Sequence, residues 1–467
     1  MKRWCLLIVG FVGLCVGLAA GPAPAVAASS VARGLCDVDL PSMTLAARLP
    51  VINELGAQLH VKYLRLVFDW PTAEPKRGHF NEQYFQTFSS IVNEARAKGM
   101  QVILTVVWTP RWASNRSLWK KPPFGFKKHH YYNFYAMKTK YLPDFHNLAY
   151  HLAKLLKGRV FGYECWNEPN LWPYIYPQKI HPWDNFAAQL YAKMLPAFSL
   201  GIKAADPQAK VIAGATAPIG DFDRFRTSPQ RFASVLKASG ADHFFDAYSH
   251  HPYMPGDSRD LSPGAPPLSP STTVSLQNLG ALLSIFPDKP FYLTEYGYNT
   301  SYSSAFGAAQ IGKTLQATYL QSAYAYAARY PQVKMLVWFL RKDWSPSGSF
   351  YDPGGIYTGL RSLDNGRKRA WFAFAGDTKL TLTGPTSSSA GAKVELTGRL
   401  SSPTLGGLRA KQLELQTSNG QTWKTLRSLS TGSNGDFHVF VHPGATTAYR
   451  VYWRGVVASG AHSISTN

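Results

Sequence analysis

The stretch QVILTVVWT, residues 101–109, is a nearly unbroken run of β-branched and apolar residues. A half-exposed strand alternates polar and apolar side chains, whereas a strand covered by helices on both faces stays apolar. Just before it, Gly99 ends an amphipathic stretch from Asn81 to Lys98, at the position where a helix stops. The stretch therefore predicts one helix followed by one buried parallel strand.

The same pattern recurs from about residue 33 to residue 375, with helical patterns such as 145–157, 183–205 and 308–329 between the apolar runs. Eight β-then-α units over roughly 340 residues predict a (β/α)8 TIM barrel with long loops. An open doubly wound sheet is the alternative, but no Gly-rich phosphate fingerprint follows any of these strands. The predicted strands are Arg33–Asp37, Val61–Trp70, Gln101–Thr109, Val160–Trp166, Lys210–Ala215, Phe244–His251, Pro290–Glu295 and Lys334–Leu340.

The composition changes after Ala375, where the chain becomes rich in Thr, Ser and Gly. Short alternating runs are separated by turn signals such as Ser418-Asn419-Gly420. This rhythm predicts a C-terminal antiparallel β-sandwich (Ig-like) with a spacing or adhesive role. Its predicted strands are Lys379–Leu382, Lys393–Leu400, Gln412–Thr417, Phe437–Val441 and Ala448–Trp453.

The N-terminus has the features of an export signal: Lys2 and Arg3, the apolar run 6–20, and a small-residue cleavage pattern at 25–27. An uncleaved anchor is the alternative. We therefore expect a signal peptide at 1–28, a catalytic barrel at 29–376 and a β-sandwich accessory domain at 377–467. The mature protein is expected to be secreted or extracytoplasmic, and monomeric.

Charge and cysteine content narrow the function further. The 467 residues have a hydrophobic content of 45% and a formal net charge of +22, which excludes wholesale disorder and favours anionic partners. After signal removal only Cys36 and Cys165 remain, too few for a disulfide framework or a cysteine metal site. Two separately buried thiols are expected, with one disulfide as the alternative.

Two carboxylates follow predicted strands. Glu168 lies in WNEPN, residues 166–170, after the fourth strand, and Glu295 ends the seventh. The C-terminal strand ends of a (β/α)8 barrel meet on one face, so barrel closure would bring the two together. Glycosidic cleavage needs such a pair, one acid to protonate the leaving oxygen and one carboxylate to attack the anomeric carbon. The alternative for each is a solvated surface glutamate.

On these residues, the chain from about 33 to 375 resembles the retaining glycoside hydrolases of clan A, most closely family 39, with family 5 a near alternative. The resemblance implies that Glu168 is the acid/base, that Glu295 is the nucleophile and that Asn167 binds the sugar 2-hydroxyl. It also implies that no metal or organic cofactor takes part. Further residues that it assigns to the site are His251 and Tyr253 after the sixth strand, Arg65 on the second, and Trp338 on the eighth as the aromatic floor under the sugar.

Electrostatics agrees with these roles. Arg65 and the Tyr253 hydroxyl should lower the pKa of Glu295, whereas burial and the charge on Glu295 should raise the pKa of Glu168. Each supporting residue has a plainer alternative. Arg65 could be a structural ion-pair partner, His250 could take the place of His251, and Trp338 could be core.

The sector after the third strand departs from the family pattern. Trp108 and Arg111 stand where many members of the clan have a histidine, so the sugar contacts there stay open. The following loop, 112–140, interleaves aromatic and basic residues, and the loop after the fourth strand contains Trp172 in an aromatic run up to Trp183. Aromatic rings stack on pyranose faces, so Trp108 and Trp172 are candidate substrate-binding residues. Loop packing and single-stranded nucleic-acid binding are the alternatives.

Together these features predict an exported retaining glycoside hydrolase that cleaves a β-linked polysaccharide from within the chain. The expected substrate is an envelope or biofilm-type glycan that is acidic or embedded in an anionic envelope. Exo-action on short β-xylosides or β-glucosides is the enzymatic alternative. A carbohydrate-binding protein that has kept the barrel is the alternative from another class, although both carboxylates are present. Nucleic acid is not an expected partner.

Overall fold

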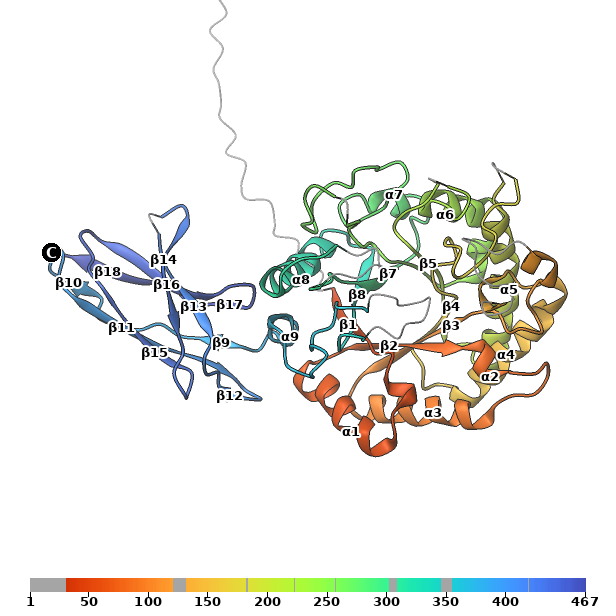
Figure 1. Cartoon of the computed structure of the whole chain (residues 1–467), viewed down its shortest axis with the longest axis horizontal. Helices are drawn as coiled ribbons and strands as arrows, with labels where there is room; N and C mark the ends of the chain where they lie inside the picture. The colour runs from red at the N-terminus through yellow and green to blue at the C-terminus, as the bar shows by residue number, and fades with distance from the viewer. Residues whose placement is uncertain are drawn as a thin grey trace, which may run out of the picture.

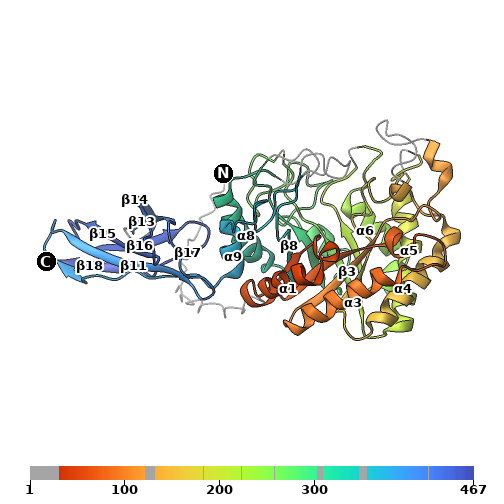
Figure 2. The same ribbon diagram turned by 60° about the horizontal axis from the view of Figure 1, so that its bottom comes forward.

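A computed structural model describes residues 31–120, 132–181, 184–221, 223–256, 258–301, 309–345, 355–418 and 420–467. The chain forms a closed eight-stranded barrel surrounded by helices, with two further β-sheets beside it (Figure 1). Turning the molecule shows the sheets extending away from the barrel at the α8 and α9 side (Figure 2). The predicted fold class, a TIM barrel with a C-terminal β-sandwich, is confirmed.

The barrel strands are parallel and lie in sequence order, with β8 pairing with β1 to close the ring. All eight predicted strands are present, within a few residues of the predicted ends. They are β1 (Ala32–Cys36), β2 (Tyr63–Asp69), β3 (Gln101–Val107), β4 (Gly162–Cys165), β5 (Lys210–Thr216), β6 (Ala247–His250), β7 (Phe291–Tyr296) and β8 (Val333–Phe339).

Helices follow most of the strands. The one predicted from the opening stretch is α3 (Glu82–Ala97); the Asn81 side chain accepts a hydrogen bond from Tyr84 N at 3.2 Å, and Gly99 follows with φ +78°. Between β6 and β7 only the four-residue α7 (Gly280–Leu283) forms, because the preceding segment is rich in proline, which lacks the N–H that a helix needs. The others are α1 (Leu45–Asn53), α2 (Trp70–Ala73), α4 (Leu142–Leu156), α5 (Phe186–Ala205), α6 (Pro229–Ala238), α8 (Lys313–Ala327) and α9 (Arg369–Ala375).

Strand alternation decides which side chains reach the inside of the barrel. On β8, Met335, Val337 and Phe339 belong to a small apolar cluster with residues of other strands, such as Cys36 of β1. Leu336 and Trp338 belong instead to the large core between the strands and the helices. Because successive strand residues point to opposite faces, odd-numbered residues of β8 face inward and even-numbered ones outward.

The C-terminal sheets pack face to face around an apolar core. One has the strand order β10-β18-β16-β13-β14 with β17 beside β16, and the other has β12-β11-β15 with β9 beside β11. The pairings are antiparallel except that of β10 with β18, which is parallel. The five predicted strands correspond to β9 (Lys379–Leu380), β11 (Val394–Ser402), β13 (Gln412–Ser418), β15 (Asp436–Val441) and β16 (Thr447–Trp453), and the structure adds β10 (Ser387–Ser388), β12 (Gly406–Gly407), β14 (Trp423–Ser430), β17 (Val457–Ala458) and β18 (His462–Thr466).

The turn between β16 and β17 docks the sandwich onto α8 and α9. The Trp453 ring packs on Phe372 of α9 with centroids 5.0 Å apart, and Gln321 of α8 donates to Val456 O at 2.8 Å. A Cβ on Gly455 would lie 2.8 Å from Thr318 N of α8, so only glycine allows this approach. The two regions are therefore joined by a packed, partly apolar contact.

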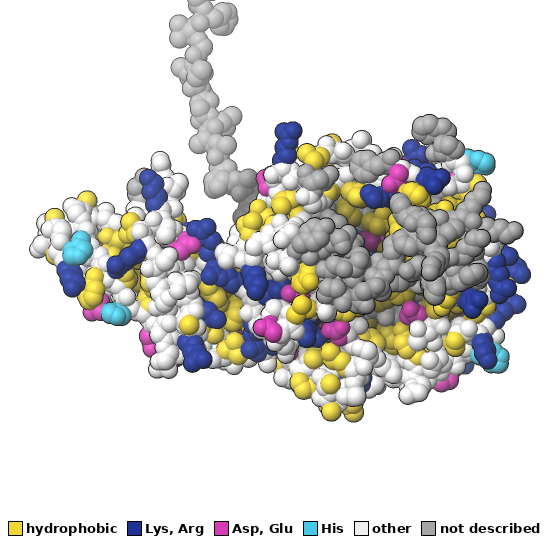
Figure 3. All heavy atoms as spheres, in the orientation of Figure 1, with side chains coloured by type: hydrophobic (Ala, Val, Ile, Leu, Met, Phe, Trp, Pro, Cys, Tyr) yellow, Lys and Arg dark blue, Asp and Glu magenta, His cyan; other side chains and the backbone are white. Residues whose placement is uncertain are grey.

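Cys36 and Cys165 are both buried and unpaired, so the expectation of two separate thiols is confirmed. Among the described residues, none of the helices combines the length and the apolar character that crossing a membrane requires. On the face shown in Figure 3, Lys and Arg side chains are spread over both the barrel and the sandwich and are more abundant than Asp and Glu, in line with the net charge of +22.

Candidate active site

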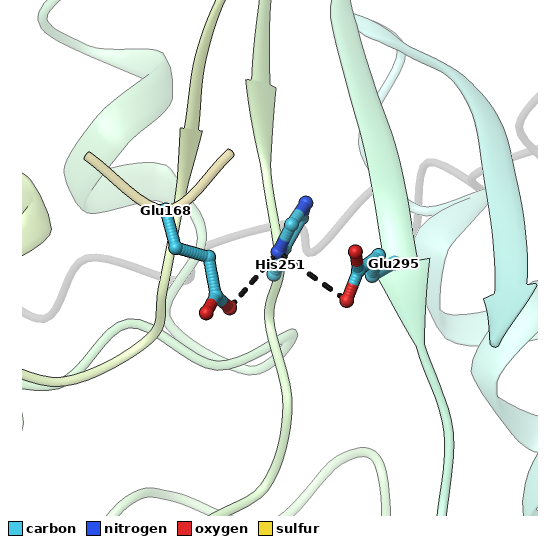
Figure 4. Close-up of side chains that lie close together, drawn as sticks. All are labelled: Glu168, His251 and Glu295. Atoms are coloured by element: carbon cyan, nitrogen blue, oxygen red, sulfur yellow. Dashed lines mark hydrogen bonds and ion pairs between the residues drawn. The ribbon is translucent and has the colours of Figure 1, made fainter. Parts of the chain in front are cut away.

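Barrel closure brings Glu168 and Glu295 together. Glu168 lies just after β4 and Glu295 lies near the end of β7, and their side chains point toward one another from either side of His251 (Figure 4). One carboxylate oxygen of each glutamate and a ring nitrogen of His251 all lie within 4.8 Å of one another. Carboxyl groups about 5 Å apart are the arrangement of retaining glycosidases, whereas inverting enzymes hold theirs farther apart to admit a water.

Arg65 of β2 links three other residues of the site. Its side chain is fully buried, and Nη1 donates to Glu295 Oε1 at 2.6 Å while Nη2 donates to Asn167 Oδ1 at 2.7 Å. Nε donates to Glu164 Oε2 at 2.9 Å. The two alternatives for Arg65 are therefore both realised, since one guanidinium is a structural ion-pair partner and also contacts the predicted nucleophile.

Glu295 is nearly buried and held by three neighbours. Besides Arg65, the Tyr253 hydroxyl donates to Oε2 at 3.1 Å, and Nδ1 of His251 lies 3.7 Å from the same oxygen. Burial raises the pKa of Glu295 above its ordinary value, while the Arg65 charge and the hydrogen bonds from Arg65 and Tyr253 lower it. Arg65 and Tyr253 thus act in the direction predicted from the sequence, but burial outweighs them.

Glu168 stands on an unusual backbone. Trp166 and Glu168 have positive φ values of 72° and 38°, a region that costs non-glycine residues free energy and that is enriched at active sites. The Glu168 N–H donates to Ala215 O of β5 at 2.9 Å, which holds the turn in place. Burial raises the pKa of Glu168 well above its ordinary value, and the charge on Glu295 raises it further, as predicted.

His251, rather than His250, contacts the carboxylates. Its Nδ1 lies 3.0 Å from Glu168 Oε1, and its Nε2 lies 3.2 Å from Thr294 Oγ1. Burial and the Arg65 charge hold the pKa of His251 well below its ordinary value, so the ring is neutral. His250 faces the outer layer, where its ring nitrogens contact Thr216 Oγ1 and Val274 O, and burial lowers its pKa to about 4.

Asn167 directly precedes Glu168 in the sequence, and in the site it is bound to the same guanidinium as Glu295. Its Oδ1 accepts from Arg65, which fixes the orientation of the amide. Within the described residues its Nδ2 has no hydrogen-bond partner. The amide NH2 is therefore the group of Asn167 that can donate to a bound sugar.

Trp338 is not a sugar platform, and this expectation is wrong. Its ring is fully buried in the outer core, and its Nε1 donates to Thr358 O at 2.8 Å. Phe339, the next residue, faces inward and packs in the same cluster as Tyr253. The aromatic ring that eighth-strand geometry offers to the site is thus that of Phe339, one position further along.

The two predicted aromatic contacts lie on the loops after β3 and β4. Trp108, which has a positive φ of 67°, is partly exposed and stacks with Tyr174, with ring centroids 6.5 Å apart and an interplanar angle of 10°. Trp172, also partly exposed, meets Phe134 edge to face with centroids 5.6 Å apart. Loop packing therefore occurs at both tryptophans. The candidates at 121–131 and at Trp183 lie outside the described residues, as does the side chain of Trp119.

Glu164 was not anticipated from the sequence. It lies on β4, two positions before Trp166, and is fully buried. Its Oε2 accepts from Arg65 and also from Thr105 Oγ1 of β3, the latter at 2.7 Å. The sequence did contain a feature that points to Glu164. A glutamate inside a buried apolar strand needs a cation as its partner, and the barrel interior is where one can lie.

Two carboxylates and an imidazole are also metal-ligand types, and these three side chains are close enough to share one ion. However, the Arg65 guanidinium lies 2.6 Å from Glu295 and repels any cation placed there. The arrangement is better suited to proton transfer and nucleophilic attack.

Comparisons with known proteins agree with this geometry. The model of the cellulase family (glycosyl hydrolase family 5) matches residues 50–343, whereas a comparison with curated proteins finds no match. A family 39 glycoside hydrolase from the gut symbiont Bacteroides cellulosilyticus WH2 is 16% identical, with a TM-score of 0.50, 89% of this chain and 82% of the other covered.

Two GH5_18 structures are similar as well, each over 74% of this chain. The one from Bifidobacterium longum subsp. infantis is 15% identical over 77% of its own length, with a TM-score of 0.54. The one from Streptomyces cattleya, in complex with GlcNAc, is 15% identical over 80% of its length, with a TM-score of 0.51. At these identities the likeness shows the fold.

The family is shown by the sequence match itself, which spans more than half of the chain and includes Glu168 and Glu295. The predicted resemblance to clan A is confirmed, with family 5, the near alternative, as the family whose model matches and family 39 among the similar structures. The chain belongs to the cellulase family, glycosyl hydrolase family 5, and is a retaining glycoside hydrolase of clan A.

Proposed function

We propose that the chain is an exported enzyme that cleaves β-linked polysaccharides from within, with Glu295 as the nucleophile and Glu168 as the acid/base. One observation carries the assignment of roles. The two carboxylates are within 4.8 Å of each other, yet only Glu295 is bound to the Arg65 guanidinium. The pair is therefore asymmetric. Arg65 favours the ionised form of Glu295, and Glu168 keeps its proton to higher pH.

In the first step, an oxygen of ionised Glu295 attacks the anomeric carbon of the sugar. The bond from that carbon to the leaving oxygen breaks, and the proton of Glu168 passes to the leaving oxygen. Arg65 and Tyr253 hold Glu295 in place for the attack. The amide NH2 of Asn167 is available to donate to the 2-hydroxyl, a contact that strengthens in the transition state.

In the second step, the charge on Glu295 is gone because the carboxylate has become an ester. The pKa of Glu168 then falls, since the neighbouring negative charge was one cause of its elevation. Glu168 can now take a proton from water, whose oxygen attacks the anomeric carbon and releases Glu295. The neutral His251 ring contacts Glu168 and adds no charge that would disturb this cycle.

The substrate proposal rests on the groups around the mouth of the barrel. Trp108 and Trp172 are partly exposed on the loops after β3 and β4 and can contribute ring faces to an extended glycan. We therefore place a chain of several sugars across the mouth, which corresponds to cleavage inside a polysaccharide. Exo-action is the competing mode.

The acidic substrate is proposed from the net charge of +22 and from a cavity of about 370 Å³ that is rich in cations, although neither Glu168 nor Glu295 is among the described residues that line it. The cavity lies between α1 and the segments that follow β1 and β8, and its cations are Arg341, Lys342, Arg361 and Arg367. Arg361 is neutralised by Glu54, and Arg341 lies between Asp37 and Asp39, which also lines the cavity. Lys342 and Arg367 form no salt bridge within the described residues, which leaves positive charge for a carboxylate, sulfate or phosphate group of the glycan.

A screen of the purified enzyme against neutral and acidic β-linked polysaccharides, with product sizes resolved over time, tests this function. Early appearance of mid-sized oligosaccharides supports internal cleavage, and release of single sugars from the start would favour exo-action. Glu295→Gln serves as the inactive control.

The acidic preference is tested by Lys342→Glu. We expect KM for an acidic substrate to rise roughly tenfold, equivalent to about 1.4 kcal/mol, and KM for a neutral one to stay the same. Lys334→Glu, at the opposite end of β8, is the matched control. Equal behaviour of the two variants on the acidic substrate would remove the cavity from the proposal.

A further inference from the structure

We propose that Glu164 is a positioning residue of the reaction: through Arg65 it sets the charge that Glu295 experiences and balances Arg65 while Glu295 is esterified. This inference rests on the proposed role of Glu295 as nucleophile. Glu164 touches neither the reacting atoms nor, within the described residues, Glu295 itself, so it acts on Glu295 through the shared guanidinium and through the repulsion between the two charges.

The geometry is that of a buried bridge. Arg65 lies between the two carboxylates, with Nη1 at 2.6 Å from Glu295 Oε1 and Nη2 at 2.7 Å from Glu164 Oε2. Neither Arg65 nor the Glu164 side chain has any exposed surface. Thr105 Oγ1 donates to the same Glu164 oxygen at 2.7 Å and fixes the rotamer. Glu164 Oε1 is buried and has no hydrogen-bond partner among the described residues.

A buried carboxylate with one oxygen left without a hydrogen bond is costly, so packing alone does not account for it. The reaction does. When Glu295 becomes an ester it loses its negative charge, and a guanidinium paired with Glu295 alone would then be an isolated buried cation. Glu164 keeps Arg65 paired in both states, so forming the covalent intermediate leaves no uncompensated positive charge.

Glu164 also affects the free enzyme. Its charge opposes that of Arg65 and raises the pKa of Glu295, which keeps the carboxylate more basic and hence a better nucleophile. The titratable and charged groups that face Glu295 come from four segments: Arg65 of β2, Cys36 of β1, Glu164 and Glu168 in and after β4, and His251 and Tyr253 after β6.

The test compares three variants. Glu164→Gln removes the charge and keeps the shape, Glu164→Asp keeps the charge and shortens the side chain, and Thr105→Val removes the hydrogen bond that Thr105 donates to Glu164. Two readouts are used: ¹³C NMR titration of the glutamate carboxyl groups, assigned with Glu168→Gln and Glu295→Gln, and the pH profile of kcat/KM on the most reactive 4-nitrophenyl β-glycoside from a panel of glucoside, xyloside, mannoside and glucuronide. The NMR titration needs no substrate.

In Glu164→Gln we expect the pKa of Glu295 to fall by about one unit or more, because Arg65 then acts on Glu295 without opposition. The acidic limb of the pH profile should move to lower pH by the same amount, and kcat/KM should drop roughly tenfold to a hundredfold. Glu164→Asp should lose activity, with the acidic limb near its original position. Thr105→Val should lose less activity and should shift neither the pKa of Glu295 nor the acidic limb.

An unshifted pKa of Glu295 in a folded Glu164→Gln protein would overturn the proposal and leave Glu164 with a structural role only. If Glu164→Gln does not fold, Glu164→Asp decides: a shift of the acidic limb as large as expected for charge removal would contradict the account. Failure of the proposed function looks different, because Glu295→Gln would then keep its activity whatever Glu164 does.

Discussion

The barrel and the C-terminal sandwich are both built from alternating strands, but they use their interiors differently. The buried side chains of the sandwich are apolar or uncharged, and no charged residue after Lys368 is buried in the described part of the chain. The mouth of the barrel buries Arg65, Glu164, His251 and Glu295 together. A sheet core needs no charge to be stable, so the charged interior of the barrel marks where the chemistry takes place.

Two ion pairs of equal length make the contrast quantitative. Arg65 and Glu295 are 2.6 Å apart with side chains 0% and 7% exposed, and Arg454 and Glu414 of the sandwich are also 2.6 Å apart but 55% and 17% exposed. Distance alone therefore does not distinguish them. Burial decides what each pair contributes, because solvent screens the second and not the first.

Exchanging a glutamate in each region should give the largest difference. Glu295→Gln should lower kcat by a factor on the order of 10⁴ to 10⁶, since the amide cannot act as the nucleophile. The matched change in the sandwich, Glu395→Gln at an exposed residue of β11, should leave kcat unchanged. Initial rates on the substrate found by the screen measure both. Retained activity in folded Glu295→Gln would place the nucleophile elsewhere.

Glu168→Gln should have the next largest effect, and it depends on the leaving group. For a sugar leaving group kcat should fall about 10² to 10⁴-fold, because protonation is lost, whereas a 2,4-dinitrophenyl glycoside needs little protonation and should form the intermediate at nearly the normal rate. The wild-type rate should decline as pH rises through the elevated pKa of Glu168.

In Glu168→Gln that alkaline decline should disappear, and added azide should restore turnover and give the β-glycosyl azide. An unchanged alkaline limb, or an α-azide product, would assign the proton donor to another group.

Removing the arginine from each ion pair should separate the two regions in stability. Arg65→Met should reduce the free energy of unfolding by about 3–5 kcal/mol, because two carboxylates stay buried without their cation. Arg454→Met should change it by less than about 1 kcal/mol. Urea unfolding followed by tryptophan fluorescence measures both. Similar losses in the two variants would mean that burial is not what distinguishes the pairs.

The junction between the two regions gives the smallest predicted effect on activity. Trp453→Ala should destabilise the protein by about 3–5 kcal/mol, because it empties the contact with Phe372, while kcat on a short soluble substrate stays within about twofold. Trp423→Ala on the edge strand β14, where the ring is partly exposed, is the matched control and should cost less. Equal thermal midpoints for the two variants would mean that the docked turn does not support the barrel.

Much of the fold could be predicted because parallel strands covered on both faces leave a strong pattern. The run at 101–109 predicted both β3 and α3, and the same signal located all eight barrel strands. The sandwich was predicted less completely. Strand β14, WKTLRSLS, is exposed along most of its length, so it has no buried alternate residues by which a sequence pattern could reveal it.

The positions of residues at strand ends could be predicted. The positions of residues that depend on which face of a strand they occupy could not. Glu168 and Glu295 follow from strand order, since closure of the barrel brings such ends together. Trp338 was placed on the wrong side because the inward parity of β8 was not applied, which selects Phe339. The choice between His250 and His251 depends on where β6 ends, and strand ends are the least certain feature of any pattern.

The central claim, that Glu295 forms a covalent bond to the sugar, is tested most directly by trapping. The 2-deoxy-2-fluoro glycoside of the preferred sugar, with a 2,4-dinitrophenyl leaving group, should inactivate the enzyme with one sugar bound per chain. After digestion, mass spectrometry should find that sugar on Glu295, in the peptide containing residues 291–297. A sugar attached to any other residue, or rapid turnover of substrate with no covalent species formed, would contradict the account.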